Sequence, residues 1–181
     1  MQVVFKHVAE KLLPEFDEEF ANTRKFLALV PNDKLLWKPH EKSMELGRLA
    51  WHLADFPEWC LATLIQNPLR MTEADAENYM HGWEGKTPAE MLAKFDATLS
   101  KARIALASTT DPEMAGHWRM EWAGQTIIDE PRADAIEKWT FRHMIHHRAQ
   151  IGVYLRILGV LIPGCYGPSA DEMEPAVPAV A

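Results

Sequence analysis

Two histidines four residues apart, His143 and His147, lie in a segment whose apolar spacing predicts a helix. Residues four apart share one helix face and are roughly 6 Å apart along the axis, so both imidazoles could bind one cation. A third histidine, His52, lies in another amphipathic segment, far earlier in the chain. Two ligands from one helix and one from another would form an open three-histidine metal site, and this is our main hypothesis.

Helical wheels place all three histidines on inward-facing stripes. The face of the His143–His147 pair carries further residues that could line a pocket: Ile136, Trp139, Gln150, Tyr154, Ile157 and Leu161. The face of His52 carries a second set: Leu49, Phe56, Trp59 and Thr63, with Arg48 and Asp55 at its margins. The stripes favour a site inside the protein rather than on its surface.

Neutral imidazole is a common ligand for zinc, the metal we expect first, and nickel, iron or manganese are alternatives. Three protein ligands leave positions for water or substrate, and a zinc ion lowers the pKa of a coordinated water to about 7. Each ligand should donate its other ring hydrogen to an acceptor, for which Asp55 and Glu45 are candidates. Gln150, Tyr154 and Trp59 are the candidate pocket residues.

A His-x-x-x-His pair is a weak signal by itself, because a chain with eight histidines produces such pairs by chance. The alternative is that these are core histidines bonded to neighbouring polar groups. His146 is a second candidate partner for His143, but it lies at the edge of the stripe. The remaining histidines are expected at the solvated surface: His7, His40, His81 and His117.

Four amphipathic segments could position these residues, and they predict an all-α four-helix bundle. The expected helices cover residues 12–29, 43–66, 88–107 and 131–158. Pro57 lies inside the second and should kink it one turn after His52. Thr87 and Glu90 form a capping box at the start of the third, and Gly159 marks the end of the fourth.

The segments between these helices are less regular. Residues 67–86 are expected to lack secondary structure. In residues 115–128, the step from Ala123 to Gly124 could turn two short extended pieces into a hairpin before the last helix. The whole chain, residues 1–181, is expected to form one domain, with a loosely ordered tail after about residue 172.

Composition limits the partners and the compartment. The 181 residues carry a net charge of −7 without a basic stripe, which argues against nucleic acid as a partner. The longest apolar stretch, residues 151–162, contains Arg156 and is too short to span a bilayer, so no membrane partner is expected. Two distant cysteines, Cys60 and Cys165, and the lack of a signal peptide indicate a cytoplasmic protein.

A second stripe lies on the opposite side of the last predicted helix. It consists of Phe141, Ile145, Gly152 and Gly159, and its small residues would let another helix approach closely. The stripe could pack inside the bundle or join two subunits, so a homodimer is one expectation.

Several of these segments resemble the DinB family of DinB/YfiT-like proteins. The likeness runs from about Phe16 to Glu172 and is strongest in residues 37–44, 46–52, 143–150 and 166–172. The resemblance implies a four-helix bundle in the order up-down-down-up. It also implies a divalent-metal site, because His52, His143 and His147 match the family's histidine on the second helix and its pair on the fourth.

The resemblance also suggests a type of reaction. Some DinB-like proteins transfer low-molecular-weight thiols, such as bacillithiol, mycothiol or glutathione, to electrophiles, and one branch is a thiol-dependent maleylpyruvate isomerase. We therefore expect a thiol S-transferase that activates a thiol, or water, for attack on a small-molecule substrate. The alternatives are a metal-dependent hydrolase, a non-catalytic stress-related protein that binds a metal or a small ligand, and a plain helical interaction module.

Overall fold

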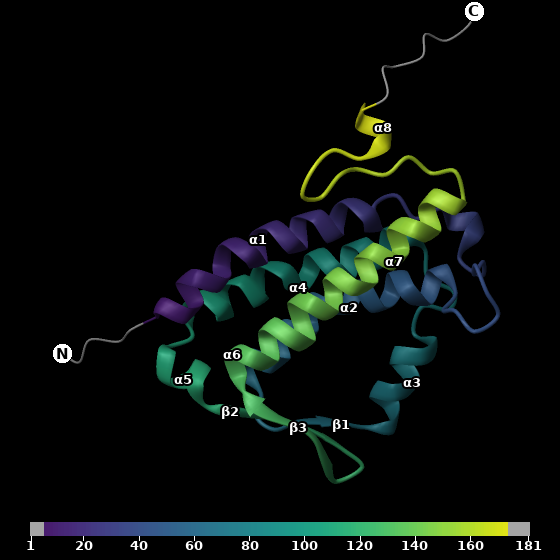
Figure 1. The fold of residues 1–181 in the computed structure, drawn as a ribbon. Helices are drawn as coiled ribbons and strands as arrows, with labels where there is room; N and C mark the ends of the chain where they lie inside the picture. The colour runs from purple at the N-terminus through teal and green to yellow at the C-terminus, as the bar shows by residue number, and fades with distance from the viewer. Residues whose placement is uncertain (1–5, 174–181) are drawn as a thin grey trace, which may run out of the picture.

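The computed structural model describes residues 6–173 (Figure 1). Within them, four long helices form the body of the fold: α1 (His7–Leu27), α2 (Leu46–Ile65), α4 (Pro88–Ser108) and α7 (His143–Ile157). A small sheet lies at one end: β1 (Leu69–Met71), β2 (His117–Trp122) and β3 (Gln125–Pro131). Shorter elements connect these parts: η1 (Asn32–Lys34), α3 (Glu73–His81), α5 (Asp111–Ala115), α6 (Arg132–Ala135), η2 (Ile136–Arg142) and α8 (Ala170–Met173). The chain is mostly helical, as predicted, but because of the sheet a strictly all-α class is not confirmed.

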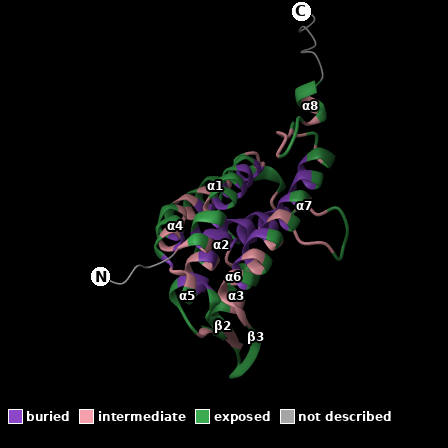
Figure 2. Ribbon diagram, turned by 60° about the vertical axis from the view of Figure 1, so that its left-hand side comes forward, coloured by how far each residue is buried: buried purple, intermediate pink, exposed green. Residues whose placement is uncertain are grey.

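Phenylalanines from three elements form the centre of the core. Phe16 and Phe20 of α1 stack with ring centroids 4.2 Å apart, and both meet Phe141 edge-on. Phe95 of α4 packs against Phe20 at 5.8 Å. Burying a phenylalanine contributes about 1.5–3 kcal/mol, so this cluster joins α1, α4 and η2 strongly. Figure 2 shows buried residues along the sides of the long helices that face one another. The up-down-down-up order stays a prediction.

The long helices begin near the predicted residues. The capping box of α4 is confirmed, because Thr87 Oγ1 accepts a hydrogen bond from the Glu90 N–H while the Glu90 carboxylate accepts one from the Thr87 N–H. Helix α1 begins earlier than expected, and Asp111 accepts a hydrogen bond from the Val8 N–H in its first turn. Helix α2 begins at Leu46, with Glu45 at its N-cap, which is later than the predicted start at residue 43. It continues through Pro57.

Residues 67–86 were expected to be irregular, and this prediction is wrong. They contain β1 and α3, which begins with a capping box in which Thr72 Oγ1 accepts from the Asp75 N–H and the Asp75 carboxylate accepts from the Thr72 N–H. This box was readable in the sequence. Strand β1 pairs in parallel with β2, which lies far away in the chain, so no local pattern indicated it.

Strands β2 and β3 form the hairpin that the sequence allowed before the last helix. Ala123 and Gly124 at its turn have φ values of 47° and 76°, and a two-residue type I′ turn needs positive φ at both positions. Trp118 of β2 is fully buried, and its Nε1 donates a hydrogen bond to the carbonyl of Gln66 at 2.9 Å. This bond ties the sheet to the end of α2.

The last long helix is interrupted by a π-helical segment. The chain runs from α6 through η2, which is π-helical, into α7. A π-helix bonds residue i to i+5, so the 3.6-residue periodicity does not hold across it. Ile136 and Phe141, predicted on opposite faces, are both fully buried. π-Helical turns often occur at functional sites, and this one ends directly before His143.

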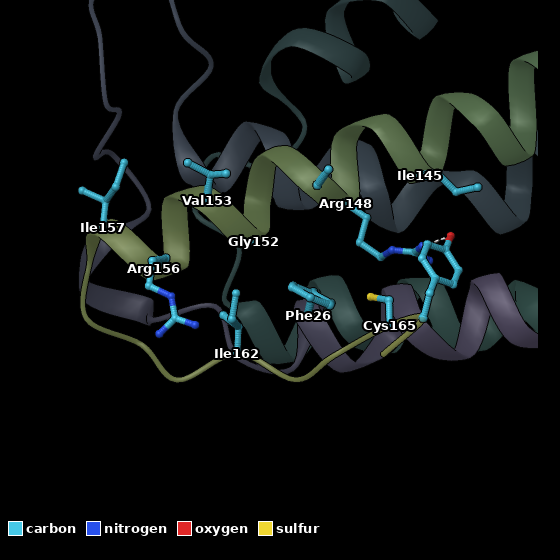
Figure 3. A pocket seen from close by; sticks show the side chains of 11 residues that line it. Phe26, Ile145, Arg148, Gly152, Val153, Arg156, Ile157, Ile162 and Cys165 are labelled. Atoms are coloured by element: carbon cyan, nitrogen blue, oxygen red, sulfur yellow. Dashed lines mark hydrogen bonds between the residues drawn. The ribbon is translucent and has the colours of Figure 1, made fainter. Parts of the chain in front are cut away.

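The residues of the second predicted stripe on this helix have different surroundings in the structure. Phe141 is buried, and so is Gly152, where an added Cβ would lie 3.0 Å from the Phe26 ring of α1. Ile145 instead lines a groove of about 390 Å³ between α7, Phe26 and the chain around Cys165 (Figure 3). Internal packing thus accounts for part of the stripe, and the homodimer stays a prediction.

After α7 the chain turns back over α1 and reaches α8 (Figure 1). Gly159 has φ 76° at the end of the helix, where the sequence predicted a stop. Asp171 of α8 accepts a hydrogen bond from Arg156 and another from the Ile162 N–H, which fixes this return segment. The predicted loose tail falls almost wholly on residues 174–181, outside the described residues. Within residues 6–173, no helix has both the length and the apolarity needed to cross a membrane.

Candidate metal centre

Three histidines meet between α2 and α7. The ring of His52 lies 5.1 Å from that of His143 and 4.6 Å from that of His147, and the latter two are 4.6 Å apart, measured between centroids. One nitrogen from each ring lies within 4.8 Å of the other two. The structure therefore brings together the three residues that the sequence predicted as ligands.

The pair on α7 turns two nitrogens toward each other. Nε2 of His143 and Nε2 of His147 are 2.9 Å apart. Two nitrogens at 2.0–2.1 Å from one cation would be about 2.8–3.4 Å apart for angles between 90° and 109°. His147 Nδ1 hydrogen bonds to Gln150 Oε1 at 2.7 Å, and the His143 ring bonds to the carbonyl of Trp139, one turn earlier. These acceptors hold the rings in place from behind.

The surroundings of His52 indicate whether a cation fits the site. The residue is only 8% exposed, and neither ring nitrogen has a hydrogen-bond partner among the described residues. Leaving a buried polar group without a partner costs about 1–3 kcal/mol, so such groups are rare. A cation shared with His143 and His147 would satisfy a nitrogen of His52. Three imidazoles are a donor set that suits zinc and similar divalent metals.

Burial keeps the three imidazoles neutral. It lowers the pKa of His52 to about 3, aided by His147, His143 and Arg48, and it lowers the pKa of His147 to about 4. The pKa of His143 is also lowered, by burial and by His146. Neutral imidazole is the form that binds metals, so protons compete weakly with a cation here at pH 7.

These shifts predict that the metal-free protein loses stability as the pH falls from about 6.5 toward 3. An unfolded histidine has a pKa of about 6.5, whereas folded His52 and His147 take up protons only near 3 and 4. Between these pH values the unfolded chain binds more protons than the folded protein. Each of the two histidines then lowers the free energy of unfolding by about 1.4 kcal/mol for every pH unit that the pH falls. Above pH 6.5 this contribution is complete.

Urea unfolding of chelator-treated protein between pH 7.5 and pH 4.5 measures this slope. A His52→Leu variant lacks one of the two groups, so its stability should fall less steeply with acid. Equal slopes for the variant and the wild type would contradict the prediction.

Of the five residues predicted as acceptors or as pocket residues, Gln150 alone hydrogen bonds to the cluster among the described residues. Its Oε1 accepts from His147, and its Nε2 lies 3.1 Å from Nε2 of His146. His146 is exposed, as expected for the edge of the stripe. The histidines expected at the surface are exposed too: His7, His40, His81 and His117.

The two predicted carboxylate partners lie elsewhere. Glu45 pairs with Lys38 at 2.8 Å, and Asp55 pairs with Lys94 at 2.8 Å, so neither bonds to His52. A charged ammonium is a stronger partner for a carboxylate than a neutral imidazole, which explains the outcome. Sequence proximity to His52 was a poor guide.

The two predicted aromatic pocket residues also lie to the side of the cluster. Trp59 packs against Trp118 at 6.2 Å, next to the sheet, and Tyr154 meets Trp37 edge-on at 5.6 Å. Within residues 6–173, no ring contact joins Trp59 or Tyr154 to the three histidines. Both belong to the supporting core rather than to the immediate wall of the site.

Phe56 and Tyr79 supply the immediate wall. Phe56 lies 5.1 Å from His52 and 5.3 Å from His143, and Tyr79 meets His52 edge-on at 5.0 Å. Phe56 was on the predicted face of His52. Tyr79 was missed because α3 was missed, and the capping box at Thr72 would have indicated that helix. Apolar rings around the histidines exclude water and strengthen electrostatic interactions within the site.

We predict that Gln150→Leu weakens metal binding about 10-fold to 100-fold, because it removes the acceptor that orients the His147 ring. Competition with a chromogenic chelator measures the affinity. His146→Ala removes the other contact of Gln150 and should leave the affinity within a factor of about three of the wild type. A Gln150→Leu variant with wild-type affinity would show that this hydrogen bond does not hold a ligand.

Comparison with known proteins identifies the family of this chain. The family model of the DinB family matches residues 1–178. The chain belongs to the DinB family. A curated relative, the uncharacterized protein YrdA from Bacillus subtilis, is 25% identical over 163 residues and 90% of each chain.

Solved structures show the same DinB fold. YfiT from Bacillus subtilis, described as a probable metal-dependent hydrolase with an unusual four-helix bundle topology, matches with a TM-score of 0.65 and 16% identity over 89% of this chain and 93% of YfiT. The mycothiol-dependent maleylpyruvate isomerase matches with a TM-score of 0.50 and 12% identity over 89% of this chain and 65% of the isomerase. At these identities the likeness concerns the fold.

Proposed function

We propose that this DinB family protein is a divalent-metal-dependent enzyme that transfers a low-molecular-weight thiol to a small electrophile. The observation that carries the proposal is the buried three-histidine cluster, in which neither ring nitrogen of His52 has another partner within residues 6–173. The descriptions of YfiT as a probable metal-dependent hydrolase and of the isomerase as mycothiol-dependent support it by analogy.

His52, His143 and His147 would hold the cation, with zinc expected first. A divalent cation there supplies Lewis-acid chemistry, which lowers the pKa of a thiol or of a water that it coordinates. The cluster itself contains no carboxylate or thiolate among residues 6–173, so three neutral ligands leave the charge of the cation uncompensated. An uncompensated positive charge favours an anionic ligand such as a thiolate. Phe56 and Tyr79 would shield the reacting groups from water.

The chain's own cysteines do not supply that thiol. Cys60 is fully buried, and burial raises its pKa to about 12. Cys165 lines the groove on the other side of α7, where none of the three histidines lies. A thiol that reacts at the cluster would therefore come from a small molecule.

An activity screen tests the proposal. Tag-free protein loaded with zinc, nickel, iron or manganese is assayed for consumption of glutathione or cysteine in the presence of a model electrophile. We expect metal-dependent thiol consumption that a chelator abolishes and zinc restores. Hydrolysis of a model ester without thiol consumption would favour the hydrolase instead. Tight metal binding without turnover of any thiol or ester would contradict an enzyme and favour a binding protein.

A further inference from the structure

Arg48 lies beside the histidine cluster. It precedes His52 by one turn on the same face of α2 and is half-buried. Both residues contact one ring of α3, since Arg48 Cζ lies 5.4 Å from the centroid of the Tyr79 ring and the His52 ring lies 5.0 Å from it. The guanidinium is close enough to His52 to help lower the pKa of that imidazole.

Arg48 has no carboxylate partner among the described residues, although it carries a full positive charge. Its Nη2 donates to the sulfur of Met80 at 2.9 Å, and a thioether is a weak acceptor. Its Nε is buried and has no hydrogen-bond partner in the part of the chain that the structure describes. Glu45, the N-cap residue of α2, is bonded to Lys38 instead.

Other arginines of the chain show what is missing at Arg48. Arg24 donates two hydrogen bonds to the carboxylate of Asp96, at 2.7 and 2.8 Å. Arg103 donates two to the carboxylate of Asp17, both at 2.7 Å. A planar guanidinium favours this two-point contact with a carboxylate. The same capacity is unused at Arg48, one helical turn from a candidate metal ligand.

We propose that Arg48 binds a carboxylate of the molecule that reacts at the three-histidine centre and so holds that molecule beside His52. The inference rests on the proposed function, since it assigns the class of ligand that this site takes. The carboxylate belongs to either the electrophile or the thiol, and in both cases the ligand of Arg48 is a small carboxylic acid. Tyr79 would pack against the guanidinium and fix its direction.

Three small probes separate the two sources of the carboxylate. 3-Mercaptopropionate carries a thiol and a carboxylate, 2-mercaptoethanol carries a thiol alone, and succinate carries carboxylates alone. Calorimetric titration gives their affinities for the zinc-loaded and the metal-free protein. The wild type is compared with Arg48→Met, Arg48→Lys and a control, Arg70→Met, which removes an exposed arginine of β1. Metal content and thermal unfolding are measured for every variant.

We expect Arg48→Met to weaken binding of at least one carboxylate probe by at least tenfold, with unchanged metal content and unchanged affinity for 2-mercaptoethanol. Arg48→Lys should fall between Arg48→Met and the wild type, because lysine keeps the charge but not the planar fork. Arg70→Met should match the wild type. If succinate alone depends on Arg48, the electrophile carries the carboxylate, whereas dependence of 3-mercaptopropionate alone assigns it to the thiol.

Equal carboxylate affinities for the wild type and both Arg48 variants would overturn the inference, and so would a wild type that binds neither acid. A fall in thermal stability with unchanged affinity would show that Arg48 only packs on Tyr79, which also overturns it. The metal content of the wild type tests the proposed function separately, since a wild type that binds no metal would contradict that function. In that case succinate binding to the metal-free protein still decides whether Arg48 binds a carboxylate.

Discussion

His52→Ala should leave the purified protein with almost no bound metal. Wild-type protein, prepared without a tag, should carry about one divalent cation per chain, because one nitrogen from each of three rings lies within 4.8 Å of the others. Loss of an outer-shell partner of a ligand costs about 10-fold to 100-fold in affinity, so loss of a ligand itself should cost about 100-fold or more. Inductively coupled plasma mass spectrometry of the dialysed proteins measures the stoichiometry.

His117→Ala is the matched control, because the ring of His117 is exposed on β2. It should retain the wild-type metal content. Circular dichroism separates loss of the site from loss of the fold, since His52→Ala should remain helical. If His52 were only a core histidine, its replacement would leave a cavity and not change the metal content. Wild-type metal content in folded His52→Ala would therefore refute its role as a ligand.

Glu19→Gln should produce a large loss of stability. Arg148 and Glu19 form a buried pair, with Nη1 to Oε2 at 2.6 Å and side chains only 4% and 6% exposed. Tyr166 completes the network, because its hydroxyl accepts from Arg148 at 2.6 Å and donates to Glu19 at 2.7 Å. Removing one charge leaves the other buried without compensation, which costs about 3–5 kcal/mol. Urea unfolding at pH 7 measures this change in free energy.

The exposed pair between Asp17 and Arg103 provides the control for Glu19→Gln. Its side chains are 46% and 50% exposed, so Asp17→Asn should cost less than about 1 kcal/mol. The double variant Glu19→Leu/Arg148→Met removes both buried charges and should be more stable than Glu19→Gln alone. Equal losses for Glu19→Gln and Asp17→Asn would contradict the account of a strongly coupled buried pair.

The buried pair also bears on the metal centre. Arg148 directly follows His147 on α7, and it bonds to the backbone carbonyl of Glu19 as well as to the carboxylate. These contacts fix how α7 is rotated against α1, and therefore the direction in which His147 points. Arg148 thus anchors α7 from a different face of the helix than the one that carries the ligand candidate His147.

Features that depend on neighbours in the chain were predictable from the sequence. The start of α4 followed from the capping box at Thr87, and the hairpin turn followed from Ala123 and Gly124. The inward direction of His52 and of the pair on α7 followed from helical periodicity, because each lies on an apolar stripe. Helix α3 belongs in this group as well, since its capping box at Thr72 is equally local.

Features that depend on distant contacts were not predictable in this way. Strand β1 exists because it pairs with β2, about fifty residues away. The π-helical segment η2 changes the periodicity of the last helix, so a single helical wheel does not describe the whole of it. Asp55 lies near His52 in sequence but bonds to Lys94 of another helix. Which partner a polar side chain chooses is decided by packing between helices.

Anomalous X-ray diffraction from crystals of the tag-free protein tests the central claim most directly. The account predicts one anomalous peak between α2 and α7, at about 2.0–2.2 Å from one nitrogen each of His52, His143 and His147. It also predicts that no fourth protein side chain binds that ion. An anomalous peak at another position in the protein, or no peak at the histidine cluster after the crystals are soaked in zinc, would contradict the claim.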